Sequence, residues 1–296
     1  MTGVLGGLLG SFVKKEVNLF AAVAYGSTRA ASSTNGITWT ARTMPASAYW
    51  WGVAFGNGVF AAISLSSTTA ASSTNGITWT ARTMPAIGNW QSVTYGNGVF
   101  AAVSDTTTAA SSTNGITWTL RTLTVSAGAN SIAFGNGVFA AVSFGNKNAL
   151  SSTDGITWTT RTMPGTPTSW YSIAFGNGVF AAVALSTSAA ASSTDGITWT
   201  LRTLPASAGW RSLAFGNGVF VTSVYNSTTA ASSTDGITWT LRTMPTNAGW
   251  YSIAFANGVF AAVSDTTTAA SSTNGITWTL RTMPSADTWF IGAATI

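Results

Sequence analysis

Short apolar runs alternate along the chain with polar turns that are rich in Gly, Asn, Ser and Thr. Within residues 250–284, the runs predict four strands, at 250–255, 259–263, 269–273 and 276–282. Asn257-Gly258 and Asn274-Gly275 fall between paired strands, and Asn-Gly readily adopts the positive φ angles of two-residue hairpin turns. Gly, Pro or Asn interrupts every longer stretch, and no segment keeps a helical period. The pattern predicts an all-β fold.

This four-stranded unit recurs seven times, and we number the repeats 1 to 7 along the chain. Its most constant string is Gly-Ile-Thr-Trp-Thr, which contains Trp39, Trp79, Trp118, Trp158, Trp199, Trp239 and Trp278. Successive copies are 39 to 41 residues apart, which matches the period of about 40–45 residues for one blade of a β-propeller. Asn precedes the string in four copies and Asp in three, which favours a role in turn geometry over a role of charge. The sequence therefore predicts a seven-bladed propeller with four antiparallel strands in each blade.

The two ends of the chain complement each other. Leu19–Val23 matches the second strand of a repeat, and nothing before it resembles a first strand. Trp289–Ala293 matches a first strand, and no second strand follows it. We expect these segments to pair and complete blade 1, because closure removes the exposed edges of an open array. The alternative is that residues 11–16 form a degenerate first strand and that the C-terminal strand pairs elsewhere.

The expected domain organisation follows from the repeats. Residues 1–16 form an N-terminal arm, and residues 17–296 form the propeller. Blade 1 combines residues 17–45 with residues 289–296. The other blades are expected at about 50–85, 90–123, 129–164, 170–205, 210–245 and 250–284.

Tryptophan also recurs just before the first strand, at Trp50, Trp90, Trp170, Trp210, Trp250 and Trp289. Each ring can bury roughly 150–250 Å². Because both sets recur regularly, we expect them to hold the blades together. A sugar-stacking role for all of them is the alternative.

Charged residues make up only 6% of the chain, against roughly 25% in an average domain. A surface rich in Ser, Thr and Asn is neutral and forms hydrogen bonds, which suits a virion, an extracellular position or a cell surface. The net charge of +5 is thinly spread, because seven of the nine arginines occupy one position of the repeat. Nucleic-acid binders usually cluster their basic residues on one face, so we expect no nucleic acid as a partner.

The chain contains no Cys and no His, which excludes disulfides, thiolate chemistry and Ser-His-Asp triads. We expect no metal site and no cofactor. The apolar residues 1–13 precede Lys14 and Lys15, whereas a secretory signal carries its positive charge ahead of the apolar run. This run is also too short and too rich in Gly to span a membrane. It is interpreted as an arm, with a frayed end or a degraded repeat as the alternative.

The string Ser-Ser-Thr-Asp-Gly-Ile-Thr-Trp at 151–158, 192–199 and 232–239 resembles the Asp-box, or BNR, repeat of sialidase-like propellers. The usual box has one more residue between Asp and Thr, and four copies here carry Asn. The near-identity of the repeats also resembles the highly repetitive propellers of phage and bacterial surface proteins. The resemblance implies a propeller in which the box lies at the turn between the two outer strands, away from an active site.

Sialidase activity does not follow from this resemblance. That family needs an arginine cluster, an acidic Asp and a Tyr activated by Glu on the central face, but the only Glu here is Glu16, in the arm. The regular arginines fall on the fourth strand, where we expect them to keep the outer edge soluble. They are Arg42, Arg82, Arg121, Arg161, Arg202, Arg242 and Arg281.

The two sides of the expected ring differ. The turns that join strands one to two and three to four share one side and are nearly identical, whereas the loops and linkers on the other side vary. On this variable side, the residue after the tryptophan of the first strand should lie at the mouth of the central channel. Aromatic rings with amide and guanidinium groups suit a sugar ligand. The candidate ligand-binding residues are Trp51, Gln91, Asn130, Tyr171, Arg211, Tyr251 and Phe290. The alternative is that this position is exposed to solvent and tolerates different residues without a role in binding.

Three aspartates, Asp105, Asp265 and Asp287, also lie on the variable side. Glycoside hydrolysis needs two carboxyl groups roughly 5–9.5 Å apart. Asp105 and Asp265 are four blades apart, and Asp265 and Asp287 can approach each other but lack an evident acid–base partner. We therefore expect no catalytic residues and no enzymatic activity.

The sequence favours a binding propeller that recognises a glycan or another surface receptor as part of a phage virion or a bacterial surface assembly. One alternative is a structural subunit of a virion or filament that docks through residues 1–16. A glycosidase is the second alternative.

Overall fold

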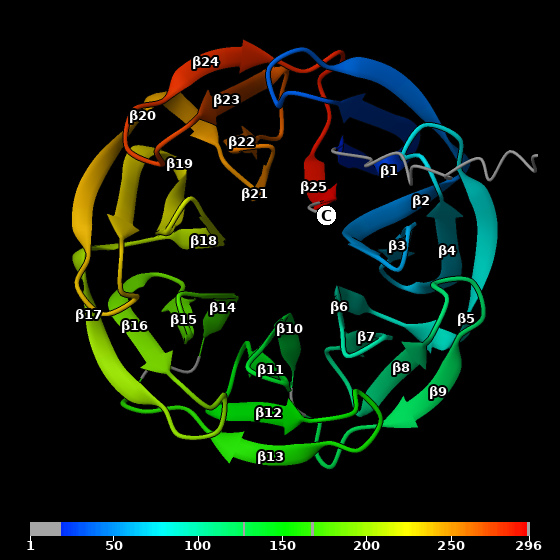
Figure 1. The fold of residues 1–296 in the computed structure, drawn as a ribbon, viewed down its shortest axis with the longest axis horizontal. Coiled ribbons are helices and arrows are strands. Elements are labelled where there is room, and N and C mark those ends of the chain that lie inside the picture. Colours follow the sequence, from blue (N-terminus) through cyan, green and yellow to red (C-terminus); the bar gives the residue numbers. More distant parts are fainter. Residues whose placement is uncertain (1–18, 127, 167–168, 295–296) are drawn as a thin grey trace, which may run out of the picture.

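The computed structural model describes residues 19–126, 128–166 and 169–294. They form a closed ring of β-strands around a central axis, with each repeat extending from the axis to the rim (Figure 1). The all-β propeller architecture is as predicted, whereas the predicted arm at residues 1–16 lies outside the described residues. No helix in the described part of the chain is long and apolar enough to cross a membrane.

The described strands pair into six antiparallel sheets. The largest holds repeats 1 and 2, with the strand order β25 (Trp289–Ala294), β1 (Leu19–Ser33), β2 (Thr40–Gly56), β3 (Val59–Ser64), β4 (Ser67–Ser73) and β5 (Thr80–Gly88). Repeat 3 holds β6 (Trp90–Gly96), β7 (Val99–Ser104), β8 (Thr108–Ser112) and β9 (Thr119–Thr122). Repeat 4 holds β10 (Ala129–Gly135), β11 (Val138–Ser143), β12 (Asn148–Ser152) and β13 (Thr159–Thr162).

The other three sheets continue the ring. Repeat 5 holds β14 (Trp170–Gly176), β15 (Val179–Ala184), β16 (Thr187–Ser193) and β17 (Thr200–Ala208). Repeat 6 holds β18 (Trp210–Gly216), β19 (Val219–Ser233) and β20 (Thr240–Gly249). Repeat 7 holds β21 (Ser252–Ala256), β22 (Val259–Val263), β23 (Thr268–Ser272) and β24 (Thr279–Thr282).

The prediction of seven separate four-stranded blades is wrong: the seven repeats form six hydrogen-bonded sheets, and in this sense the propeller has six blades. Strand β2 joins repeats 1 and 2, because it runs unbroken from the outer strand of one into the inner strand of the other. At this junction Tyr49 pairs with Tyr25, and the two ring centroids are 4.8 Å apart. In repeats 2 and 5, Asn89 and Gly209 occupy the corresponding position and the strand breaks there, whereas in repeat 6 the strand includes Gly249 and ends after it.

Two long strands also change the predicted strand count. β1 and β19 each run through the positions that are the second and third strands of other repeats. Gly26 and Asn226 lie within them with φ of 67° and 50°, which lets the chain turn there without leaving the extended pairing. The sheet of repeat 6 consequently has three strands.

The predicted closure of the ring is confirmed. β25 pairs with β1 in antiparallel register from Leu19–Ala294 to Ala24–Trp289, so the alternative placement of the C-terminal strand is wrong. Leu19 and Ala294 lie at the end of this pair where the other repeats carry their first turn. Both described ends of the chain therefore lie on the side of the turns.

The first turn of repeats 2 to 7 is an Asn-Gly turn, as predicted, and Asn97 and Gly98 have φ of 47° and 78°. The second turn differs from the prediction, because only its Gly has a positive φ. There Asn114 uses its Oδ1 to accept hydrogen bonds from the backbone N–H groups of Ile116 and Thr117, both at 2.9 Å. This wider turn delays the fourth strand, so that β24 begins at Thr279 and not at residue 276.

Neighbouring repeats pack through glycines that lie under aromatic rings. A Cβ at Gly56, Gly96, Gly135, Gly176 or Gly216 would overlap the ring that the next repeat supplies, which is Tyr95, Phe134, Phe175, Phe215 or Phe255 respectively. In repeat 7 this place holds Ala256, and β25 carries Ala293, the partner of Phe20, where the other repeats supply the ring. The seam of the ring therefore has matched small residues. Trp50, Trp90, Trp170, Trp210, Trp250 and Trp289 are fully buried, which supports their predicted structural role.

Candidate binding site

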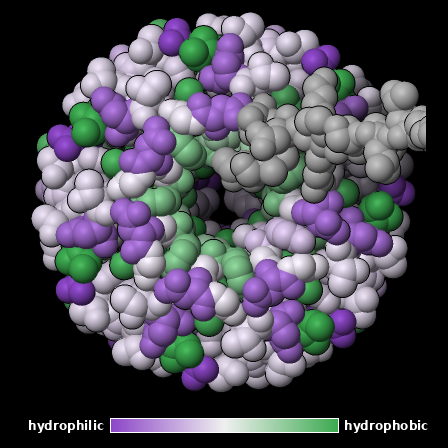
Figure 2. All heavy atoms as spheres, in the orientation of Figure 1, coloured by the Kyte–Doolittle hydropathy of each residue, from purple (hydrophilic) through white to green (hydrophobic). Residues whose placement is uncertain are grey.

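All seven predicted ligand-binding residues line one cavity, whose volume is about 160 Å³. The ring is open along its axis, and apolar residues line much of the opening (Figure 2). Six of the seven side chains are half-buried, and Phe290 is buried with 8% of its surface exposed. None of the seven is fully exposed. Ligand binding at these residues stays a prediction.

Irregular strand pairing positions five of these side chains. In β6, Trp90 pairs with Ser104 and Ser92 pairs with Val103, which leaves Gln91 as the extra residue of a β-bulge. The same register shift makes Trp51, Asn130, Tyr171 and Arg211 the extra residues of β-bulges in their strands. A bulge redirects the side chain of its extra residue. Phe290 differs, because it pairs regularly with Val23.

A collar of serines fixes the inner strands around the cavity. The residue after each bulge in repeats 3 to 6 is a serine, and its hydroxyl accepts a hydrogen bond from a backbone N–H of the next repeat. The pairs are Ile132 to Ser92, Ile173 to Ser131, Leu213 to Ser172 and Ile253 to Ser212, at 2.8 to 3.3 Å. Ser252 of repeat 7 accepts from Ile291 on β25 in the same way, at 3.3 Å. This collar links the inner strands of neighbouring repeats around the cavity.

Arg211 lies among three tyrosine rings. Its guanidinium carbon is 4.1 Å from the ring centroid of Tyr251, 4.7 Å from that of Tyr225 and 5.3 Å from that of Tyr171. No carboxylate of the described residues forms an ion pair with it, and its Nε is buried without a hydrogen-bond partner. The positive charge is therefore held by aromatic faces.

Burial also changes the acidity of these tyrosines. Burial raises the pKa of Tyr171, although the charge of Arg211 acts in the opposite direction. Burial, together with a hydrogen bond to Tyr225, raises the pKa of Tyr251 to about 12. Both phenols stay protonated at neutral pH and can donate hydrogen bonds.

The two candidate amide side chains, Asn130 and Gln91, differ in whether their polar groups are free to bind a ligand. Asn130 donates from Nδ2 to the backbone carbonyl of Tyr171 at 2.6 Å, so this amide has a structural partner. Gln91 makes no hydrogen bond within the described part of the chain, although it lines the same cavity. Gln91 can therefore direct its amide to a ligand.

The structure adds aromatic residues that the sequence-based prediction missed. Tyr25, Phe144 and Tyr225 follow directly after the buried residues of the second strand in their repeats. Each contacts one of the predicted ligand-binding residues. The ring centroids are 6.0 Å apart for Tyr25 and Trp51, 6.4 Å for Phe144 and Tyr171, and 5.2 Å for Tyr225 and Tyr251. Like the position of the predicted residues, this position varies among the repeats and lies on the variable side. Its variability in the sequence could therefore have identified it.

Each of the three aspartates of the variable side has a partner. Asp287 forms an ion pair with Arg29 at 3.0 Å and accepts from the hydroxyl of Ser285. Asp105 accepts from Nδ2 of Asn89. Asp265 accepts from the hydroxyl of Tyr225 at 3.3 Å. These contacts hold the three carboxylates in separate environments.

The regular aspartates and arginines serve the outer strands. In repeat 4, Asp154 accepts from the N–H groups of Ile156 and Thr157, both at 2.8 Å. Burial raises the pKa of Asp154, but these hydrogen bonds and that from Ser152 outweigh burial and lower it. The arginine of each fourth strand donates from Nε to a serine of the third strand, as Arg161 does to Ser151 at 2.9 Å.

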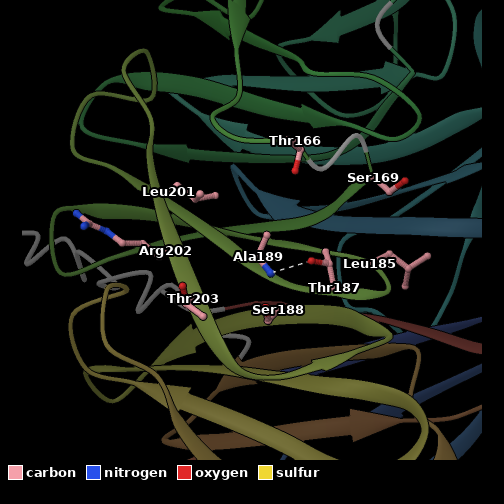
Figure 3. A pocket seen from close by; sticks show the side chains of 9 residues that line it. All are labelled: Thr166, Ser169, Leu185, Thr187, Ser188, Ala189, Leu201, Arg202 and Thr203. Atoms are coloured by element: carbon pink, nitrogen blue, oxygen red, sulfur yellow. Dashed lines mark hydrogen bonds between the residues drawn. The ribbon is translucent and has the colours of Figure 1, made fainter.

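A larger hollow of about 400 Å³ lies on the rim of repeat 5 (Figure 3). Its walls are mostly small polar residues, such as Thr187 and Ser188, and the side chain of Arg202 extends away from the others. None of the predicted ligand-binding residues lines it. The described residues contain no group of three or more His, Cys, Asp or Glu that could hold a metal ion.

No protein-family model and no curated protein matches the sequence, but solved structures share its propeller fold. Virginiamycin B lyase from Staphylococcus aureus is 13% identical, with a TM-score of 0.71 over 79% of this chain and 84% of the lyase chain. YCF48 bound to D1 peptide is 14% identical, with a TM-score of 0.65 over 84% of this chain and 86% of that chain. The computationally designed Ika8 protein is 10% identical, with a TM-score of 0.59 over 88% of this chain and 82% of that chain. At these identities the likeness shows the fold alone.

Proposed function

We propose that this chain is a non-enzymatic binding propeller that recognises a surface glycan through the cavity on its axis. The observation that carries the proposal is convergence: seven variable residues, one from each repeat, line a single cavity. Five of them are extra residues of β-bulges, which direct side chains without disturbing the repeats. Aromatic faces with the amide of Gln91 and the guanidinium of Arg211 match the apolar faces and hydroxyl groups of a sugar.

The absence of histidine supports a non-enzymatic role. Among the solved structures is a catalytically inactive variant of virginiamycin B lyase in which alanine replaces a histidine, and this chain contains no histidine. In addition, each of the three aspartates of the variable side has a hydrogen-bond partner. A screen of chromogenic glycosides with the intact protein and with Asp287→Asn tests this part, and turnover that Asp287→Asn abolishes would refute it.

The proposed location is a phage virion or a bacterial surface, and the repeats are proposed to be relatives of Asp-box propellers. The low charge of the chain and its near-identical repeats support both proposals. The side chains of Ser152 and Asp154 bind within the turn between the two outer strands, where the resemblance to the Asp-box places them. No nucleic acid, metal ion or cofactor is proposed as a partner.

Binding of the purified protein to an array of host-surface glycans tests the function. We expect a restricted set of bound glycans, and at least a tenfold loss for the double variant Tyr171→Ala, Tyr251→Ala. Ile116→Ala is the matched control, because this exposed side chain lies on the turn side of the ring. An array without binding, or an equal loss in both variants, would contradict the proposal.

A structural subunit is the second candidate, and the position of the chain ends favours it. Leu19 lies on the side of the turns, opposite the cavity, so a segment that precedes it joins the ring there. This arrangement suits docking through residues 1–16 with the cavity directed outwards. Removal of residues 1–16 should then abolish assembly, whereas Tyr171→Ala should leave assembly intact.

A further inference from the structure

Four aromatic residues form a continuous series on the variable side, which we call the aromatic track: Phe290, Trp51, Tyr25 and Tyr49. Successive ring centroids are 4.3 Å apart for Phe290 and Trp51, 6.0 Å for Trp51 and Tyr25, and 4.8 Å for Tyr25 and Tyr49. The exposed fraction rises from 8% at Phe290 to 40% at Tyr25 and 50% at Tyr49. The track therefore begins buried and ends in solvent.

The strand order gives the track its direction. Phe290 and Trp51 belong to the innermost strands and line the cavity. Tyr25 follows the second-strand core of repeat 1, and Tyr49 belongs to the stretch of β2 that returns from the outer strand. Strands of a repeat lie progressively farther from the axis (Figure 1). The track thus leads from the cavity away from the axis over repeats 1 and 2.

The size of the cavity limits what it can enclose. Its volume of about 160 Å³ is below the range of roughly 300–1,000 Å³ that is usual for ligand pockets. A group the size of one sugar ring is the most it can take, so a larger ligand must continue outside. On the opposite side of the cavity, Phe144 is exposed beside Tyr171, but its only ring contact among the described residues is with Tyr171.

We propose that the site binds the end of an oligosaccharide chain, with the terminal sugar in the cavity and the next units along the aromatic track. This proposal rests on the proposed glycan-binding function and specifies its ligand as a chain end of several units. Stacking on an aromatic face contributes to binding separately at each ring. Affinity should therefore increase with chain length until the track is covered.

Calorimetric titration with size series of three oligosaccharides tests the proposal: β-1,4-linked N-acetylglucosamine, β-1,4-linked glucose and α-1,4-linked glucose, each from monomer to hexamer. For a series that binds, we expect affinity to rise by roughly two- to tenfold with each of the first added units, the effect of one aromatic contact, and then to level off. Equal affinity for monomer and hexamer would overturn the chain-end proposal but leave glycan binding intact. Absence of binding in all three series would count against both.

Two variants copied from other repeats locate the added affinity. Tyr49→Asn introduces the residue that repeat 2 has at this place, Asn89, and should remove the part of the gain that Tyr49, the outermost ring, contributes, while it preserves binding of the monomer. Phe144→Leu, which copies Leu185, is the matched control and should keep the full gain. Circular dichroism confirms that both variants fold. If Tyr49→Asn keeps the gain, or if both variants lose it equally, the track does not carry the chain.

Discussion

Trp51 and Phe290 lie with their ring centroids 4.3 Å apart, although one belongs to repeat 2 and the other to the last strand of the chain. Phe290 also contacts Tyr251 of repeat 7, at 5.6 Å. The residue that helps to close the ring therefore also lines the cavity. Ring closure and the candidate site depend on the same side chain.

Phe290→Ala should destabilise the protein by about 3 kcal/mol, the low end of the cost of truncating a buried Phe. The variant loses contacts to Trp51 and Tyr251 at once and weakens the attachment of β25. Urea denaturation followed by tryptophan fluorescence measures the change. Phe144→Ala, at a side chain that is 47% exposed, should change the free energy of unfolding by less than about 0.5 kcal/mol. Equal effects of the two variants would contradict the role of Phe290 in closure.

Gly135→Ala should destabilise the ring, because its Cβ would overlap the ring of Phe175 in the next repeat. Overpacking of this kind costs about 1–3 kcal/mol. Gly209→Ala is the matched control, since nothing lies within 4 Å of a Cβ there and its φ is not positive. This control should be neutral or slightly stabilising, and thermal unfolding compares the two. A tolerated Gly135→Ala would mean that neighbouring repeats can shift apart at little cost.

The stability of the protein should fall as pH rises from about 10 to about 12. An unfolded tyrosine has a pKa of about 10, whereas Tyr251 in the folded protein has a pKa of about 12. Between these values the unfolded chain loses the proton and the folded protein keeps it, so the free energy of unfolding decreases with increasing pH. Tyr251→Phe should show a shallower decrease in urea titrations across this range. Identical slopes for the two proteins would contradict the burial of this phenol.

Asp154→Asn should leave stability within about 0.5 kcal/mol, whereas Asp154→Ala should cost about 1 kcal/mol. Four repeats already use Asn at this place, and the turn needs only an oxygen that accepts from two backbone N–H groups. Because the pKa of Asp154 is lowered, the ionised form stabilises the fold above the ordinary pKa of Asp, and this contribution is lost as pH falls below it. Chemical denaturation at pH 7 and pH 3 measures both effects. A large loss in Asp154→Asn would show that the charge itself matters.

Much of the fold could be predicted from local patterns. The Gly-Ile-Thr-Trp-Thr strings reveal the repeats, and Leu19–Val23 with Trp289–Ala293 reveals how the ring closes, because each is half of one repeat. The same alignment identified Tyr171, Arg211 and the other variable residues of the inner strands. These features depend on strand length and turn chemistry, which act within a few residues of sequence.

The tertiary structure decided what depends on partners distant in sequence. Strand β2 runs unbroken from repeat 1 into repeat 2, which makes six sheets from seven repeats, and the repeat pattern alone does not indicate this. The bulges that direct Gln91 and Arg211 into the cavity depend on the register with the neighbouring strand, as does the aromatic track. A repeat pattern determines which strands form and in what order, but pairing register and side-chain contacts arise only when the ring brings its strands together.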